Sequence, residues 1–191
     1  MSQKRQEIIE NAVKTLKNGG TILYPTETIW GIGCDATNEK AIRKIYKIKK
    51  RQKNKPLILL VNSIKLLENY IQPVPDIAYQ LIEKEKQPTT IIYNDPKKLP
   101  NILIHQNTIG IRVVKNHDIQ ILLQKFNKAI TSTSANISNH NNPVNFSEID
   151  SHIKNNVDYI VPENFTQSKN TNRSSTIIKI NNDSSIKIIR K

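Results

Sequence analysis

Apolar residues recur every three or four positions in several segments of this chain, which is the spacing of one buried face of an α-helix. Thr37 or Asn38 can cap a helix that runs to residue 48, and Gly19 suits the position just after a helix that ends at residue 18. Glu148 would lie in the first turn of a short helix opened by Ser147. The pattern predicts long helices at residues 3–18, 38–48, 77–85 and 118–126, and short ones after Ser63 and from Ser147.

Short apolar runs alternate with these segments and are bounded by Gly, Pro or Asn, as β-strands are. The run at 57–61 is apolar without interruption, which is typical of a strand covered on both faces. Gly110 interrupts another run and indicates close approach of a neighbouring group. Residues 181–184, Asn-Asn-Asp-Ser, separate the last two runs and predict a hairpin. Strands are expected at residues 21–24, 57–61, 89–93, 108–114, 129–133, 159–161, 176–180 and 186–189.

Alternating helices and strands favour the α/β class, with one twisted sheet of parallel and antiparallel strands and flanking helices. The chain of 191 residues is long enough for one core, and neither a repeat nor an interior linker divides it. Residues 1–191 are therefore predicted to form a single domain. No apolar run reaches the ~18 residues of a membrane span, and the polar N-terminus has no signal-peptide core. We expect a cytoplasmic protein with no membrane partner.

The chain is strongly basic, with a formal net charge of +13. This charge would suit a polyanion such as RNA, a nucleotide or a membrane surface. AT-rich coding explains the joint richness in Lys, Asn and Ile equally well, and many lysines would then only solvate the surface. Cys34 is the single cysteine, which excludes an internal disulfide, and a buried packing role is commoner for it than nucleophilic chemistry. The four histidines have no metal-ligand spacing.

The segment 23–36 holds the densest candidate chemistry. Residues 26–28, Thr-Glu-Thr, follow the strand at 21–24, at the strand end where α/β sheets gather ligands. Gly31 and Gly33 permit unusual backbone conformations or close approach of a ligand. An ordinary polar loop with turn glycines between a strand and a helix is an equal alternative, because a short Gly-x-Gly match is weak.

Further polar clusters supply cations and hydroxyls, without a general base or a covalent nucleophile. Such a set would bind and position an anion, as phosphoryl-transfer sites do, although no Walker or dinucleotide motif is present. Arg112 lies in an apolar strand, where a guanidinium needs a carboxylate from the protein or from a ligand. Ordinary alternatives are helix-dipole compensation at 49–51 and loop backbone pairing at 132–136. The clusters are residues 26–28, 49–51, 108–112, 132–136 and 174–176.

In order and spacing, these motifs resemble those of the YrdC family, whose enzymes are threonylcarbamoyl-adenylate synthases that prepare the t6A modification of tRNA. The resemblance covers nearly the whole chain and implies a YrdC-like fold with a basic concave face. The similar segments are Tyr-Pro-Thr-Glu-Thr at 24–28, Gly-Ile-Gly at 31–33 with Asp-Ala at 35–36, Lys-Lys-Arg at 49–51 with Lys-Pro-Leu at 55–57, Thr-Ile-Gly-Ile-Arg at 108–112, Ser-Ala-Asn at 134–136 and Ser-Thr-Ile at 175–177.

The resemblance implies a nucleotidyltransferase. L-Threonine and bicarbonate would form a carbamate that attacks the α-phosphate of ATP, and pyrophosphate would leave as threonylcarbamoyl-AMP forms. Mg²⁺ is expected with ATP, held by phosphates and water more than by protein. The catalytic set would be Lys49, Arg51, Ser134 and Asn136. Threonine would be bound by Thr28, Arg112, Ser132 and Ser175, and ATP by Arg51, Lys55, Thr108, Ser134, Asn142 and Arg190.

Four positions depart from the family's pattern. These departures bear on the detailed contacts with substrate and not on membership of the family. Leu60 stands where some members have a histidine, and Gln87 begins a stretch that lacks the usual glycine. Lys179 stands where an acid is frequent. Asn139 replaces a common glycine, and the turn there should survive because Asn tolerates a left-handed backbone best after Gly.

Two other functions stay open. An RNA-binding module without ATP turnover would show strongly salt-dependent affinity. A carbamoyl-transfer enzyme would resemble the YrdC-like domain of hydrogenase maturation proteins, which carry further domains. The chain resembles the short, single-domain form of the family. Its expected partners are ATP, L-threonine and bicarbonate, with tRNA and the downstream threonylcarbamoyl-transferase proteins of the t6A pathway as further ones.

Overall fold

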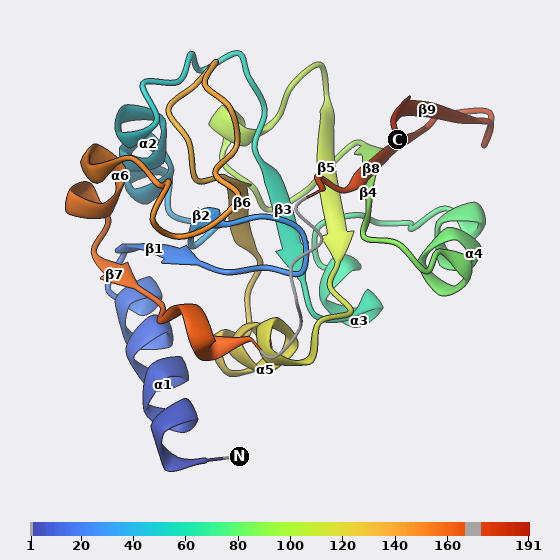
Figure 1. Ribbon diagram of the computed structural model, residues 1–191. Coiled ribbons are helices and arrows are strands. Elements are labelled where there is room, and N and C mark those ends of the chain that lie inside the picture. Colours follow the sequence, from blue (N-terminus) through green and yellow to red (C-terminus); the bar gives the residue numbers. More distant parts are fainter. Residues whose placement is uncertain (1, 167–172) are drawn as a thin grey trace.

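The computed structural model describes residues 2–166 and 173–191, and in this part of the chain nine strands form one sheet. The strand order is β7-β1-β2-β6-β3-β5-β4-β8-β9, and Figure 1 shows the helices arranged around it. Parallel pairs (β1 with β7, β3 with β5, β4 with β8) mix with antiparallel ones, which confirms the predicted fold class. The strands are β1 Thr21–Tyr24, β2 Gly31–Cys34, β3 Ile58–Val61, β4 Thr89–Asn94, β5 Thr108–Val113, β6 Ile130–Ser134, β7 Tyr159–Ile160, β8 Thr176–Ile180 and β9 Ile186–Arg190.

Two apolar clusters cover the two faces of the sheet. Leu59 belongs to one cluster and Leu60 to the other, and neither has exposed surface, so β3 is covered on both faces as its continuous apolar run predicted. Helices α1 and α5 contribute to the cluster with Leu60, and α2, α3 and α6 to the other. The helices are α1 Gln3–Lys17, α2 Glu39–Ile48, α3 Ile64–Leu67, α4 Asp76–Lys84, α5 His117–Phe126 and α6 Ser151–Asn156, with 3-10 turns at Asn101–Leu103 and Glu163–Phe165.

Helix ends follow the predicted chemistry at most positions. Asn38 caps α2 by accepting a hydrogen bond from the backbone N–H of Ala41, and Gly19 follows α1 with a φ of +75°. The short helix predicted from Ser147 is wrong, because α6 begins four residues later behind the cap of Asp150. Glu148 instead accepts from the backbone N–H of Val144, and it closes a local turn rather than a helix terminus.

The second strand was not predicted. The sequence predicts no strand at residues 31–34, which form β2 between β1 and β6. A Cβ atom at Gly33 would collide with the carbonyl oxygen of Thr131, so the glycine is required by close approach of a neighbouring strand and not of a ligand. Gly110 is similarly crowded: a Cβ there would lie 3.2 Å from a methyl of Thr90 and 3.3 Å from one of Ile58.

Strand alternation brings polar side chains onto one sheet face. Along β6, Ile130, Ser132 and Ser134 share a face, and Ile130 belongs to the apolar cluster with Leu60. Leu60 is paired in register with Arg112 on the neighbouring β5. The apolar residues of this face pack with α1 and α5, and its polar residues lie farther along the same strands.

The C-terminal strands form the predicted hairpin, with β8 and β9 antiparallel. The polar sequence of residues 165–174 is typical of a loop, but residues 167–172 of it lie outside the described part of the chain. Among the described helices, none has the length and apolarity that a bilayer crossing requires.

Candidate functional site

A cavity of about 380 Å³ opens on the sheet face that carries Ile58, Arg112 and Ser132. Its volume is in the range of small-molecule sites. Six separate parts of the chain contribute walls: the loop after β1, the loop after α2, the strand β3, the strand β5, the strand β6 with the loop after it, and the C-terminal hairpin. Eight of the twelve site residues predicted from the sequence line it, namely Thr28, Arg51, Arg112, Ser132, Ser134, Asn142, Ser175 and Arg190.

Three guanidinium groups give this cavity a positive potential, and among its described lining residues none is acidic. Arg51 is held by the loop after α2, because its Nε and Nη2 donate to the carbonyls of Lys55 (3.3 Å) and Pro56 (3.0 Å). Arg190 donates from Nε and Nη2 to the carbonyl of Ser175 at 3.2 and 2.8 Å, which fastens β9 to the start of β8. The cations are thus placed before any ligand arrives.

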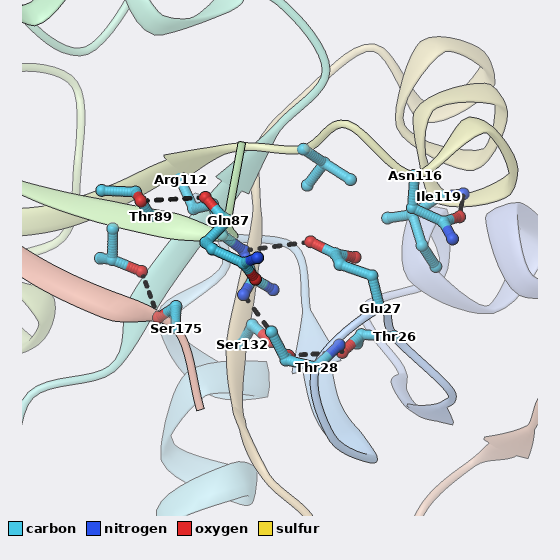
Figure 2. A network of polar contacts seen from close by, with 12 residues as sticks. Thr26, Glu27, Thr28, Gln87, Thr89, Arg112, Asn116, Ile119, Ser132 and Ser175 are labelled. Atoms are coloured by element: carbon cyan, nitrogen blue, oxygen red, sulfur yellow. Dashed lines mark hydrogen bonds and ion pairs between the residues drawn. The ribbon is translucent and has the colours of Figure 1, made fainter. Parts of the chain in front are cut away.

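Arg112 is the most deeply buried cation of the cavity, with 3% of its surface exposed. Its Nη1 donates to the hydroxyl of Thr28 at 3.4 Å, and its Nε lies 3.6 Å from the carboxylate of Glu27 (Figure 2). The Nε has no hydrogen-bond partner in the described part of the chain. A buried guanidinium with an unused donor is suited to donate hydrogen bonds to a ligand carboxylate, whose two oxygens match its planar fork.

Hydroxyl groups next to Arg112 are oriented by their neighbours. Thr26 Oγ1 donates to the carbonyl of Ile29 at 2.7 Å, so Thr28 must be the donor in the 2.8 Å bond between the Thr26 and Thr28 hydroxyls. The Thr28 oxygen is therefore left as an acceptor facing Arg112. Tyr24, whose pKa is raised by burial, donates to Ser132 Oγ at 3.0 Å.

Ser175 also lines the cavity, and its hydroxyl is held by a neighbouring hydroxyl. Its hydroxyl lies 2.8 Å from that of Thr90, and its carbonyl is the acceptor for Arg190. Fixed hydroxyls from two separate segments of the chain thus lie near Arg112, and Figure 2 shows Ser132 and Ser175 close to the guanidinium.

Lys49 lies beneath the cavity and has no exposed surface. Its ammonium donates to three oxygens, the carbonyls of Ser134 and Asn136 and the side-chain oxygen of Asn136. Burial, and after it the positive charge of Arg51, lowers the pKa of Lys49 to about 7. All three N–H bonds are used within the protein, so Lys49 fixes the Ser-Ala-Asn loop rather than contacting a ligand.

Four predicted site residues do not line the cavity. Lys49 and Asn136 support the loop from below, and the Asn136 side chain accepts from Ser134 Oγ at 2.5 Å. Lys55 reaches across to the side chain of Asn139 (2.6 Å), whose φ of +72° matches the predicted left-handed turn. Thr108 donates to the carbonyl of His105 at the start of β5. A role of Lys55 or Thr108 toward ATP stays a prediction.

Sequence reasoning missed several residues that build the site. Glu27 belongs to the predicted cluster 26–28 but was given no role; its carboxylate lies 3.6 Å from Arg112 Nε and is a nearby counter-charge without a hydrogen bond. Tyr24 orients Ser132, although its family motif gave no role to its hydroxyl. Trp30 lines the cavity, and its ring packs at a tilt against that of Phe146, with 5.1 Å between the ring centroids. This contact joins distant segments, so no local pattern predicts it.

Metal binding by the protein itself has no support in the described residues, where no group of three His, Cys, Asp or Glu side chains could hold an ion. The donor set of the cavity consists of cations, hydroxyls and amides, which suits a metal ion only if a ligand's phosphates bring and hold it. Mg²⁺ therefore stays a prediction tied to ATP.

The sequence model of the Sua5/YciO/YrdC family, described as "Telomere recombination", matches residues 14–191. A Methanocaldococcus jannaschii protein with the provisional name threonylcarbamoyl-AMP synthase is 36% identical over 187 residues, covering 97% of this chain and 86% of the relative. A threonylcarbamoyl-AMP synthase of Pseudoalteromonas translucida is 33% identical over 162 residues, covering 83% of this chain and 87% of the relative.

Among solved structures, P. abyssi Sua5 complexed with L-threonine is similar, with a TM-score of 0.80 and 24% identity over 92% of this chain. The match covers 51% of that Sua5 chain, so the present chain spans about half its length. At this identity the likeness establishes the fold alone. The family match over residues 14–191 and the 36% identity with the Methanocaldococcus jannaschii relative show that this protein belongs to the Sua5/YciO/YrdC family.

Proposed function

We propose that the protein is an L-threonylcarbamoyladenylate synthase, which converts L-threonine, bicarbonate and ATP into threonylcarbamoyl-AMP and pyrophosphate for the t6A modification of tRNA. One observation carries the proposal: eight residues chosen from scattered motifs line a single positively charged cavity. The names of the curated relatives support the same activity.

Threonine binds at the inner end of the cavity, around Arg112. The threonine carboxylate receives two parallel hydrogen bonds from the guanidinium, which is buried and has an unused donor. The hydroxyls of Ser132 and Ser175 flank this position, and that of Thr28 faces the guanidinium as an acceptor. Because these groups are already fixed by Tyr24, Thr90 and Thr26, little side-chain freedom is lost on binding.

The amine of threonine attacks bicarbonate, and water leaves as the carbamate forms. A carbamate oxygen then attacks the α-phosphate of ATP, and pyrophosphate departs. Arg51 and Arg190 line the same cavity and stabilise the negative charge that builds on the phosphate oxygens. Lys49 holds the loop of Ser134 and Asn136 rigid, so the Ser134 hydroxyl keeps its position toward the nucleotide.

Mg²⁺ would supply charge neutralisation to the departing pyrophosphate, and the phosphates would hold it. The basic composition supports contact with tRNA, and the product would pass to the threonylcarbamoyl-transferase proteins of the t6A pathway. The reaction would take place in the cytoplasm, where ATP and tRNA are available.

The test is an omission experiment on the purified protein, with pyrophosphate as the readout. We expect release only when ATP, L-threonine and bicarbonate are all present. Release that ignores threonine would reject this substrate, and no release together with salt-dependent RNA binding would favour the RNA-binding alternative. Release that requires carbamoyl phosphate in place of bicarbonate would favour a carbamoyl-transfer enzyme.

A further inference from the structure

A second cavity, of about 300 Å³, lies at the end of the sheet where β5 ends and β4 begins. None of the predicted site residues lines it. The inner face of α4 and the neighbouring strands give it a largely aliphatic wall, whose members are Leu81, Ile82, Ile91, Ile111 and Val113.

Two acidic residues, Glu27 and Glu85, also line this cavity, and the Glu27 carboxylate has an oxygen without a partner among the described residues. Glu27 lines the second cavity, and its side chain is 14% exposed. Its Oε1 is 3.6 Å from Arg112 Nε, which is too long for a good hydrogen bond. Its Oε2 is buried and has no hydrogen-bond partner among the described residues. Burying a carboxylate oxygen without a hydrogen-bond donor costs free energy, so Glu27 Oε2 is suited to accept a hydrogen bond from a ligand.

Two lysines and two amide side chains line the same cavity, and no hydrogen bond joins any of them to Glu27 among the described residues. Lys86 is exposed to solvent. Lys115 lines the cavity, but its ammonium donates to the carbonyl of Glu85. Asn116 also lines it; the Asn116 Oδ1 caps α5 at 3.0 and 3.1 Å from two backbone nitrogens, and its Nδ2 has no partner among the described residues. Figure 2 shows the Glu27 side chain between Arg112 and Asn116.

We propose that this second cavity binds a small primary amine with an aliphatic body. The ammonium group donates to Glu27 Oε2, and the alkyl chain packs between α4 and the strands, against Ile82, Ile111 and Val113. A cation is favoured over an anion because the unpaired oxygen belongs to a carboxylate, and an alkyl body is favoured because the wall is aliphatic.

The probe is n-pentylamine at neutral pH, with 1-pentanol as the neutral compound of the same shape. Binding is followed on the full chain through amide chemical shifts in nuclear magnetic resonance. Two variants locate the site: Glu27→Gln keeps the side-chain shape without the charge, and Ile82→Trp fills the cavity from the helix side. Glu83→Trp, on the exposed side of α4, is the matched control.

We expect saturable shifts around Ile82 and Val113, with pentylamine at least tenfold tighter than pentanol. Glu27→Gln should remove this preference, Ile82→Trp should abolish binding of both compounds, and Glu83→Trp should change neither. Equal affinities for the two compounds, or amine binding that survives Ile82→Trp, would overturn the proposal. The test needs neither ATP nor threonine, so its outcome is independent of the proposed activity.

Discussion

Replacing Arg112 with lysine tests the assignment of the threonine site. Lysine keeps a positive charge opposite Glu27, so the buried carboxylate retains a counter-charge and the fold should survive. What lysine lacks is the planar fork, which presents two parallel N–H groups to one carboxylate. Alanine would be a poorer choice, because it would leave Glu27 buried without a cation.

The magnitude follows from the environment of Arg112. Its guanidinium is 3% exposed, so water replaces a lost contact poorly. A hydrogen bond to a charged group contributes ~1.5–3 kcal/mol, and the variant loses one of two such bonds. Since 1.4 kcal/mol corresponds to a factor of ten, the threonine KM should rise roughly 10- to 150-fold.

The assay measures pyrophosphate release while one substrate is varied and the others are saturating. For Arg112→Lys we expect the threonine KM to rise and the ATP KM to change less than threefold. Arg51→Lys is the matched control in the same cavity and should show the reverse. If Arg112→Lys raised both KM values equally, or if both variants gave the same pattern, the division of the cavity into an amino-acid end and a nucleotide end would be wrong.

The contacts of Lys49, Tyr24, Asn38 and Glu27 each lead to a further expected outcome. The pKa of Lys49 is lowered, so above pH ~7 the folded state binds fewer protons than the unfolded state. The free energy of unfolding of the wild type should therefore rise between about pH 7 and 10 relative to that of Lys49→Met. Urea unfolding at several pH values measures this difference. Activity should fall over the same range, because neutral Lys49 no longer donates three hydrogen bonds to the loop of Ser134 and Asn136; a pH–rate profile shared with Lys49→Met would contradict this. Tyr24→Phe should lower the free energy of unfolding by about 1 kcal/mol and raise the threonine KM, whereas an unchanged KM would mean that Ser132 needs no orientation. Asn38→Ala should lower the free energy of unfolding by about 1 kcal/mol through loss of the α2 cap and leave both KM values unchanged. Saturating pentylamine should lower the threonine KM, since it takes the Glu27 charge away from Arg112, and pentanol should not; equal effects would show that the charge is not transmitted.

The fold was largely predictable where the local pattern and the packing agree. The helix faces of α1, α2 and α5 are marked by apolar spacing that no other structure satisfies, and the uninterrupted run of β3 required burial on both faces. The strand β2 was not predictable in this way. Its sequence Gly-Ile-Gly-Cys has little intrinsic strand preference, and it is a strand because β1 and β6 pair with it on both sides.

The lining of the cavity was largely predictable as a set of residues, and the contacts between those residues were less so. Arg112 and Ser132 lie on the same face of the sheet, and Ser175 lies directly before β8, so the three residues meet. Side chains alternate between the two faces along a strand, and this alternation can be followed in the sequence. The contact of Arg112 with Glu27 and that of Lys49 with the Ser-Ala-Asn loop join distant segments, and only the three-dimensional arrangement determines them. The second cavity was missed for the same reason, because α4 and Glu27 have no relation in sequence.

The most direct test of the central claim follows carbon-13-labelled bicarbonate through the reaction with ATP and L-threonine, using mass spectrometry of the nucleotide products. If one basic cavity joins the amino acid to the nucleotide, the label must appear in a single compound that contains both threonine and AMP. Conversion of ATP to AMP or ADP without such a labelled compound would contradict the account.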